Sequence, residues 1–229
     1  MLTTTNLTKR FGTRTLWHDL NLEVHDGEMV AITGPSGCGK STLLNCIGLL
    51  EPINGGTITL DNTNLTRLRP GQARRLRRDQ LGYLFQNYAL IENLSALGNL
   101  RESVGARPRR SRASRTDCEQ ALTHVGLADH IHDRVYQLSG GEQQRVALAR
   151  LIVRHPTLVL ADEPTGALDH TNTEMVIATL RTLAHDGATI LIATHSDHVV
   201  SGCDREISLA PDHAAETPPE HPRRALDDA

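Results

Sequence analysis

The sequence predicts an α/β protein in which helices pack on a mostly parallel sheet. Residues 158–161 are a continuous apolar run, as expected of a strand buried on both faces of such a sheet, and residues 189–194 are expected to form a second buried strand. The segment between them, 172–185, places Val176, Leu180 and Leu183 at helical spacing. Strands that alternate with helices in this way favour a parallel sheet covered by helices.

The N-terminal third adds short strands and one helix. Turn residues at 26–27 and 54–56 separate segments that are typical of strands. The strands are expected at 2–7, 21–24, 29–33, 57–60 and 81–85, and the helix at 40–49. This part of the chain therefore carries most of the predicted strands.

The middle of the chain changes character. From about residue 87 to 155 strand signals disappear and helical periodicity takes over, with helices expected at 116–125 and 142–154 and an Arg/Ser-rich exposed loop at 107–115. We expect this part to be a helical lobe inserted into a domain that spans residues 1–210. Residues 211–229, rich in Pro, Glu, His and Asp, are expected to form a disordered tail.

Composition excludes several classes of protein. A net charge of −3 gives no reason to expect nucleic-acid binding. No apolar run approaches the ~18 to 20 residues of a membrane span, and the first residues do not resemble a secretory signal. The four cysteines are scattered without a C-x-x-C pair, which predicts reduced thiols in a cytoplasmic protein.

Residues 34–41, Gly-Pro-Ser-Gly-Cys-Gly-Lys-Ser, fit the phosphate-binding loop G-x-x-x-x-G-K-S/T. The loop follows a predicted strand and opens a predicted helix, so backbone N–H groups and the helix dipole would face phosphate oxygens. Lys40 would bridge the β- and γ-phosphates, and the Ser41 hydroxyl would coordinate Mg²⁺. The residues expected at the nucleotide are Gly34, Pro35, Ser36, Gly37, Cys38, Gly39, Lys40, Ser41 and Thr42.

A second pair of candidate residues follows the buried strand at 158–161. Asp162 and Glu163 end this strand, and ligands of open α/β sheets lie at strand carboxyl ends. Asp162 would hold the Mg²⁺ shell, as the equivalent acid does in P-loop enzymes. Glu163 could polarise the attacking water. The sequence thus predicts both halves of a P-loop NTPase core.

The stretch 138–145, Leu-Ser-Gly-Gly-Glu-Gln-Gln-Arg, predicts another anion-binding helix N-terminus. Two such termini with one nucleotide site suggest that the second serves a neighbouring subunit. Together these segments resemble the ATP-binding-cassette nucleotide-binding subunits, whose signature motif reads LSGGQ or a close variant. The resemblance covers roughly residues 1 to 210, and it implies that Ser139, Gly140, Gly141 and Glu142 contact the nucleotide of a partner cassette.

The resemblance assigns roles to further residues. Phe11 matches the aromatic residue that stacks on adenine, although a core phenylalanine at a strand end is the competing interpretation. Gln86 matches the glutamine that contacts Mg²⁺ and water, and His195 matches the histidine at the γ-phosphate. Residues 167–169 resemble a loop that crosses the dimer interface. Residues 194–198 could alternatively form a metal site.

The family also implies a fold and partners. The fold is a P-loop core with an N-terminal antiparallel β subdomain and an inserted α-helical subdomain. The partners are a second cassette, most simply an identical one, and a membrane permease, with the chain on the cytoplasmic face of the membrane. The cofactors are ATP and Mg²⁺, and the activity is ATP hydrolysis coupled to transport.

Two segments indicate a type within the family. Residues 85–90 and 163–169 resemble lipoprotein-release and macrolide-export cassettes, and residues 84–100 resemble bacteriocin-export cassettes. They imply export of a peptide, a bacteriocin or a lipid-linked substrate. The alternatives are mechanical work or sensing at the membrane, and a soluble ATPase of the translation or repair type. The arginine-rich stretches 67–78 and 107–115 are solvated surfaces or lie near anionic lipid headgroups.

Overall fold

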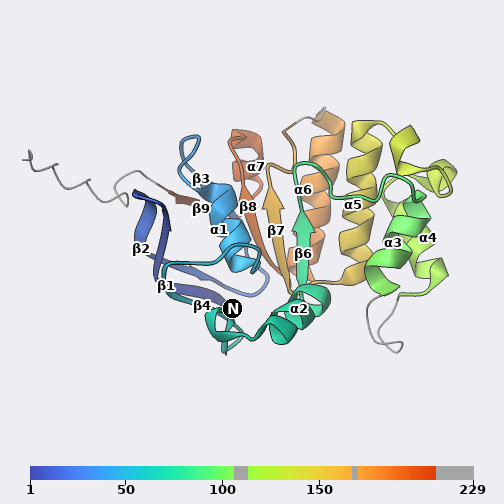
Figure 1. Cartoon of the computed structure of the whole chain (residues 1–229). Helices are drawn as coiled ribbons and strands as arrows, with labels where there is room; N and C mark the ends of the chain where they lie inside the picture. Colours follow the sequence, from blue (N-terminus) through green and yellow to red (C-terminus); the bar gives the residue numbers. More distant parts are fainter. Residues whose placement is uncertain (106–112, 167–169, 210–229) are drawn as a thin grey trace, which may run out of the picture.

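Two sheets form the framework of the protein (Figure 1). The computed structural model describes residues 1–105, 113–166 and 170–209. One sheet is antiparallel, in the order β2-β1-β4-β5, and the other is parallel, in the order β6-β7-β8-β3-β9. The strands are β1 (Leu2–Phe11), β2 (Arg14–Val24), β3 (Met29–Thr33), β4 (Gly55–Leu60), β5 (Thr63–Asn64), β6 (Leu81–Leu84), β7 (Leu158–Asp162), β8 (Thr189–Ala193) and β9 (Arg205–Ser208).

Helices cover the parallel sheet and extend beyond it. In Figure 1 the antiparallel sheet lies at one end of the molecule and α3 and α4 lie at the other. The helices are α1 (Lys40–Ile47), α2 (Pro70–Asp79), α3 (Ala96–Gly105), α4 (Arg115–His124), α5 (Gly140–Arg154), α6 (His170–His185) and α7 (Asp197–Ser201), with 3₁₀ turns η1 (Leu65–Arg67), η3 (Ala128–His130) and η4 (Val135–Gln137). None of the helices in the described ranges is long and apolar enough to cross a bilayer.

The parallel sheet is buried on both faces, as its apolar strands predict. Along β7, Leu158 and Leu160 belong to a core shared with α1 and the antiparallel sheet. Val159 and Ala161 belong to a second core shared with α5 and α6. Successive side chains of a strand point to opposite faces, so a strand covered on both sides needs an apolar residue at every position. The predicted α/β fold, with its antiparallel and helical parts, is confirmed.

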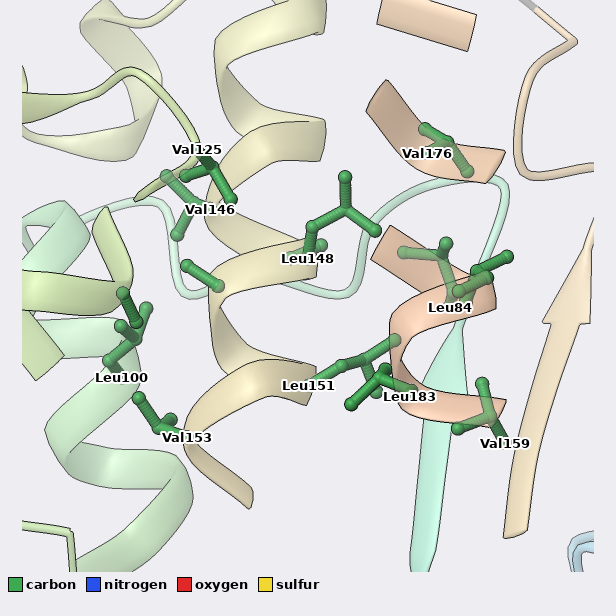
Figure 2. Packing of buried hydrophobic residues seen from close by; sticks show 14 of the residues in the cluster. Leu84, Leu100, Val125, Val146, Leu148, Leu151, Val153, Val159, Val176 and Leu183 are labelled. Carbon is green, nitrogen blue, oxygen red and sulfur yellow. The ribbon is translucent and has the colours of Figure 1, made fainter. Parts of the chain in front are cut away.

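Helix α5 connects the helical part to the sheet (Figure 2). On one side its Val146 and Val153 lie towards Leu100 of α3 and Val125 after α4. On the other side Leu148 and Leu151 lie towards the packed residues Leu84, Val159, Val176 and Leu183. Because α5 is buried from both sides, it holds the helical part against the sheet.

The structure extends the first two predicted strands. β1 continues to Phe11 and β2 begins at Arg14, so residues 12–13 form the turn of a long hairpin. The prediction ended the first strand at residue 7, before the charged residues Lys9 and Arg10. Lys9 is nevertheless buried, since its charge is paired inside the fold.

Other expectations have mixed outcomes. The stretch 67–78 contains the last residue of η1 and most of α2, and four of its six arginines are exposed. Helix α1 ends at Ile47, two residues earlier than predicted. Residues 106–112, 167–169 and 210–229 lie outside the described residues, and with them most of the predicted loop 107–115, the loop 167–169 and the tail. The limits 1–210 and 87–155 stay predictions.

The packing of α5 generates a stability prediction. Leu151 is 1% exposed and lies between α5, α6 and the sheet, so Leu151→Ala should lower the free energy of unfolding by about 2–5 kcal/mol through lost burial and a cavity. Urea denaturation followed by circular dichroism measures the change. The matched control is Leu50→Ala, at a 49% exposed position, which should change stability by less than about 1 kcal/mol. Equal effects of the two variants would contradict a core role for Leu151.

Candidate functional site

Three neighbouring strands end at the same edge of the parallel sheet. β7, β8 and β3 are adjacent and parallel, so the segments that follow them emerge side by side. The predicted phosphate loop follows β3, Asp162 and Glu163 end β7, and Thr194 and His195 follow β8. The topology therefore brings together residues that lie more than 120 positions apart in sequence.

The phosphate loop depends on glycine at both ends. Gly34 has a φ of 137°, and a Cβ there would lie 2.6 Å from the carbonyl oxygen of Leu209. Gly39, the N-cap of α1, has a φ of 100°, and its Cβ would lie 2.8 Å from Nε1 of Trp17. Both the left-handed backbone and the close contacts exclude a side chain. The loop consequently lies against the body of the protein, with α1 pointing its N-terminus at the site.

Lys40 begins α1 and is buried under the loop. Its ammonium donates hydrogen bonds to the carbonyl oxygens of Gly34 at 2.8 Å and Pro35 at 3.4 Å. Its Nζ also lies 3.0 Å from Nε2 of His195. The ammonium thus lies between the loop and the end of β8, where its N–H groups could donate hydrogen bonds to a phosphate oxygen.

A hydrogen bond joins the two halves of the site. The hydroxyl of Ser41 donates to Oδ1 of Asp162 at 2.9 Å. A hydroxyl and a carboxylate oxygen at this separation are oxygen ligands of the kind that Mg²⁺ prefers. The donor set fits the predicted cation, with room left for water and phosphate oxygens. Among the residues the structure describes, no group of three or more His, Cys, Asp or Glu is arranged to hold a metal, which leaves the alternative metal site at 194–198 without support.

Glu163 has a strained backbone and a side chain held at one oxygen. Its φ is 45°, and its N–H donates to the carbonyl of Ala193 at 2.9 Å, which ties the end of β7 to β8. Oε2 accepts from the Thr194 hydroxyl at 3.5 Å and from the His195 N–H at 3.4 Å. Oε1 is buried, lies 3.6 Å from Nε2 of His195 and has no hydrogen-bond partner within the described ranges. A carboxylate oxygen left in this way is a suitable acceptor for the proton of a water molecule.

A cavity of about 560 Å³ brings these groups together. Phe11 lines the cavity and is 49% exposed, so the interpretation of Phe11 as a core residue is wrong. The lining residues are Phe11, Arg14, Leu16, Ser36, Gly37, Gly39, Lys40, Ser41, Thr42, Gln86, Glu163, Gly166 and His195. The volume and the residue types suit a nucleotide, because the lining combines an aromatic ring with phosphate-binding groups.

The lining differs from the predicted set in two ways. Gly34, Pro35, Cys38 and Asp162 are not among the lining residues, although Gly34 and Pro35 offer carbonyls to Lys40 and Asp162 contacts Ser41. Three lining residues were not predicted: Arg14, Leu16 and Gly166.

Arg14 shows which signal could have found one of the missed residues. It pairs with Phe11 across the β1–β2 hairpin, and its guanidinium donates to the carbonyl of Gly37 at 2.9 Å. A complete hairpin prediction would have placed Arg14 opposite Phe11 and hence beside the cavity. Arg14 adds a second long cationic side chain to the cavity that Lys40 also lines.

The signature segment lies elsewhere in the fold. Ser139 caps α5: its hydroxyl accepts from the N–H of Glu142 at 3.4 Å, and both its N–H and its hydroxyl donate to Oε2 of Glu142 at 2.8 Å. The Ser139 hydroxyl is the main cause of a lowered pKa of Glu142. Ser139 and Gly140 are exposed, and none of residues 139–142 lines the cavity of their own chain.

Helix α5 nevertheless contacts two segments that adjoin the cavity. The Gln144 amide donates to the carbonyl of Pro164, one residue after Glu163. The Arg150 guanidinium donates to the carbonyls of Tyr88 at 2.8 Å and Ala89 at 2.6 Å, in the segment that follows Gln86. Burial lowers the pKa of Arg150 to about 10. The signature helix is therefore mechanically connected to the neighbours of two cavity residues.

Comparison with known proteins gives the same assignment as the geometry. A family model described as "ABC transporter" matches residues 17–166. A macrolide export ATP-binding/permease protein, MacB of Psychrobacter arcticus, is 40% identical over 192 residues, which cover 84% of this chain and 29% of that protein. YvrO of Bacillus subtilis, an uncharacterized ABC transporter ATP-binding protein, is 40% identical over 190 residues, 83% of each chain.

Solved structures of similar sequence have the same fold. The dimeric structure of MJ0796, described as a bacterial ABC transporter cassette, matches with a TM-score of 0.83 and 36% identity over 92% of this chain and 94% of that one. A dimeric post-hydrolysis state of the same cassette, bound to ADP and Pi, gives a TM-score of 0.84 and 33% identity over 95% of this chain and 99% of that one. The chain therefore belongs to the ABC transporter family, in which it is an ATP-binding, ATP-hydrolysing cassette.

Proposed function

We propose that this chain is the motor subunit of an exporter: two cassettes bind MgATP between them, and hydrolysis drives a separate membrane permease. The observation that carries the proposal is the cavity itself. It combines an exposed aromatic ring, a phosphate loop with Lys40, and Glu163, whose Oε1 accepts no hydrogen bond from any residue that the structure describes. Phosphoryl transfer to water requires mainly such positioning and charge stabilisation.

The phosphate end of the cavity holds the charge of the nucleotide. Lys40 already directs its ammonium at the carbonyls of the loop, and a γ-phosphate entering there would replace these neutral acceptors with a charged one. Ser41, Asp162 and Gln86 would hold Mg²⁺. The cation, when bound, neutralises the charge that develops on the phosphate oxygens. The adenine base would stack on Phe11, and such stacking contributes about 1–3 kcal/mol.

Glu163 is proposed as the general base. Two donors, from Thr194 and His195, hold the carboxylate at Oε2, and Oε1 has no hydrogen-bond partner among the described residues, so Oε1 is the oxygen that we assign to the attacking water. Oε1 would accept the water proton as the water oxygen bonds to the γ-phosphorus, while the bond from that phosphorus to the β,γ-bridging oxygen breaks and ADP leaves with the oxygen. The His195 ring, beside both Glu163 and Lys40, would contact the γ-phosphate.

The signature segment is proposed to act on a second chain. Ser139 and Gly140 are exposed at the N-terminus of α5 and away from their own cavity. A helix N-terminus with glycine backbone N–H groups binds anions. The dimeric state of MJ0796 supports an arrangement in which residues 139–142 of one chain cover the γ-phosphate bound by the other. The simplest such pair is a homodimer.

The place of work is proposed to be the cytoplasmic face of a membrane. The macrolide-export relative is named an ATP-binding/permease protein, and this chain matches 29% of it. A cassette of this kind supports export of a peptide, a bacteriocin, a macrolide or a lipid-linked substrate by a separate permease.

The role of Glu163 is tested by Glu163→Gln. The amide cannot accept the water proton, so kcat for ATP hydrolysis should fall by at least ~100-fold. ATP binding should survive, and ATP should hold the variant in a dimer that size-exclusion chromatography with light scattering detects. Glu119→Gln, on the surface of α4, is the control and should keep the wild-type rate. Turnover near wild type in Glu163→Gln would contradict a catalytic-base role.

The composite dimer is tested by complementation. Lys40→Ala should abolish tight nucleotide binding, and Ser139→Arg should block the segment that covers a partner's phosphate, so each variant alone should be inactive. A mixed dimer contains one intact site, made of Lys40 from one chain and Ser139 from the other. Random pairing makes about half of the dimers mixed, and each mixed dimer has one intact site of its two. Mixing the variants should therefore restore up to about a quarter of the wild-type rate. A mixture as inactive as its components would refute the shared site.

The membrane role is tested by capture. Tagged Glu163→Gln protein, recovered from gently solubilised membranes of its native host with MgATP, should retain a polytopic membrane protein in stoichiometric amount. Lys40→Ala serves as the control that cannot form the ATP-bound dimer. Recovery of ribosomes or soluble partners alone would contradict the exporter role and favour the translation or repair class. The ATPase chemistry would be unaffected by that outcome.

A further inference from the structure

Lys9 is an ammonium buried in the antiparallel part of the fold. Its side chain is 4% exposed, although it lies on β1 only two residues before the exposed Phe11. Nζ donates to Oε1 of Glu51 at 2.7 Å and to the carbonyl of Pro52 at 2.6 Å. Burying a charge is costly unless it is paired and hydrogen-bonded, so these two acceptors explain how the fold tolerates Lys9.

The same ammonium lies over the ring of Phe11. Nζ is 4.5 Å from the ring centroid, within the range of a cation–π contact. An ammonium has three N–H donors, and two of them are directed at Glu51 and Pro52. The contact occupies one face of the ring, while the side chain remains 49% exposed and lines the nucleotide cavity.

We propose that Lys9 is a positioning residue for the nucleotide base: its buried ammonium fixes the Phe11 ring so that the opposite face is presented to adenine. The inference rests on the proposed stacking role of Phe11. Phe11 ends β1 beside the turn at residues 12–13, where backbone pairing alone leaves the ring free to rotate. A ring held before the ligand arrives loses less entropy on binding.

The anchor of Lys9 also belongs to the other half of the site. Glu51 and Pro52 follow α1, the helix that begins with Lys40 of the phosphate loop. The backbone N–H of Glu51 donates to Asn45, within α1, at 3.2 Å. Lys9 therefore connects the ring proposed for the base to the helix proposed for the phosphates.

The test compares two ligands that are not hydrolysed. MgADP contains the base, and inorganic pyrophosphate with Mg²⁺ lacks it. Lys9→Met removes the charge and keeps the apolar stem, so the Kd for ADP should rise about three- to tenfold while the Kd for pyrophosphate is unchanged. Lys9→Arg keeps a cation and should restore much of the ADP affinity. Isothermal titration calorimetry measures both ligands, with pyrophosphate as a competitor where its binding is weak.

A double-mutant cycle with Phe11→Ala separates this inference from the proposed function. In the Phe11→Ala background, Lys9→Met should have no further effect on ADP binding. If Phe11→Ala weakens ADP binding and Lys9→Met does not, only the role of Lys9 is overturned. If Phe11→Ala itself leaves ADP binding unchanged, the stacking role fails and this inference fails with it.

Two more outcomes decide the remaining cases. A Lys9→Met variant that loses ADP and pyrophosphate affinity equally would show that Lys9 supports the phosphate loop and would overturn its role at the ring. Should Lys9→Met fail to fold, Glu51→Gln carries the test, because it removes the negative charge that holds the ammonium. That variant should weaken ADP binding selectively, and unchanged ADP affinity would overturn the inference.

Discussion

The site depends on one constraint: β7, β8 and β3 run parallel and side by side, so their carboxyl ends meet at one edge. This arrangement places the hydroxyl of Ser41 2.9 Å from Asp162 and the nitrogen of Lys40 3.0 Å from that of His195. These residues come from segments that are distant in sequence, and the fold is what brings their polar groups together. The buried apolar strands thus do more than stabilise the core, since their register determines which polar groups meet above it.

Helix α5 extends this constraint from the sheet to the helical part of the molecule. Its apolar faces are buried between α3, α4, α6 and the sheet, so it packs against both the helical part and the sheet. Arg150 holds the carbonyls of Tyr88 and Ala89, whose φ values of 60° and 47° are strained for residues with a side chain. The segment after Gln86 is therefore held in an unusual conformation by the helix that carries the signature residues.

Much of the fold could be predicted from the sequence, and so could many of the residues that line the cavity, because each depends on local pattern. Gly34 directly follows strand β3, and Lys40 is the first residue of helix α1. A continuous apolar run identifies β7. Features that depend on long-range pairing could not be predicted. The predicted strand ended at residue 7 and so left out Lys9, whose partner Glu51 lies 42 residues away in the sequence. Arg14 was missed with the rest of the hairpin. A charged residue is recognised as buried only once its counter-charge is located.

The signature segment raises a question of charge, because Glu142 would bring a carboxylate towards a partner's phosphate. The structure compensates that charge within the chain. One carboxylate oxygen accepts two hydrogen bonds from Ser139, and the other lies 3.6 Å from His130 and 4.0 Å from Arg145. Charge on a group with several close donors is spread over its partners and acts more weakly at a distance. The N–H groups of Gly140 and Gly141 and the positive end of the helix dipole lie at the same terminus and favour an anion there. A glutamate is consequently compatible with the same role as the glutamine that more often ends this motif.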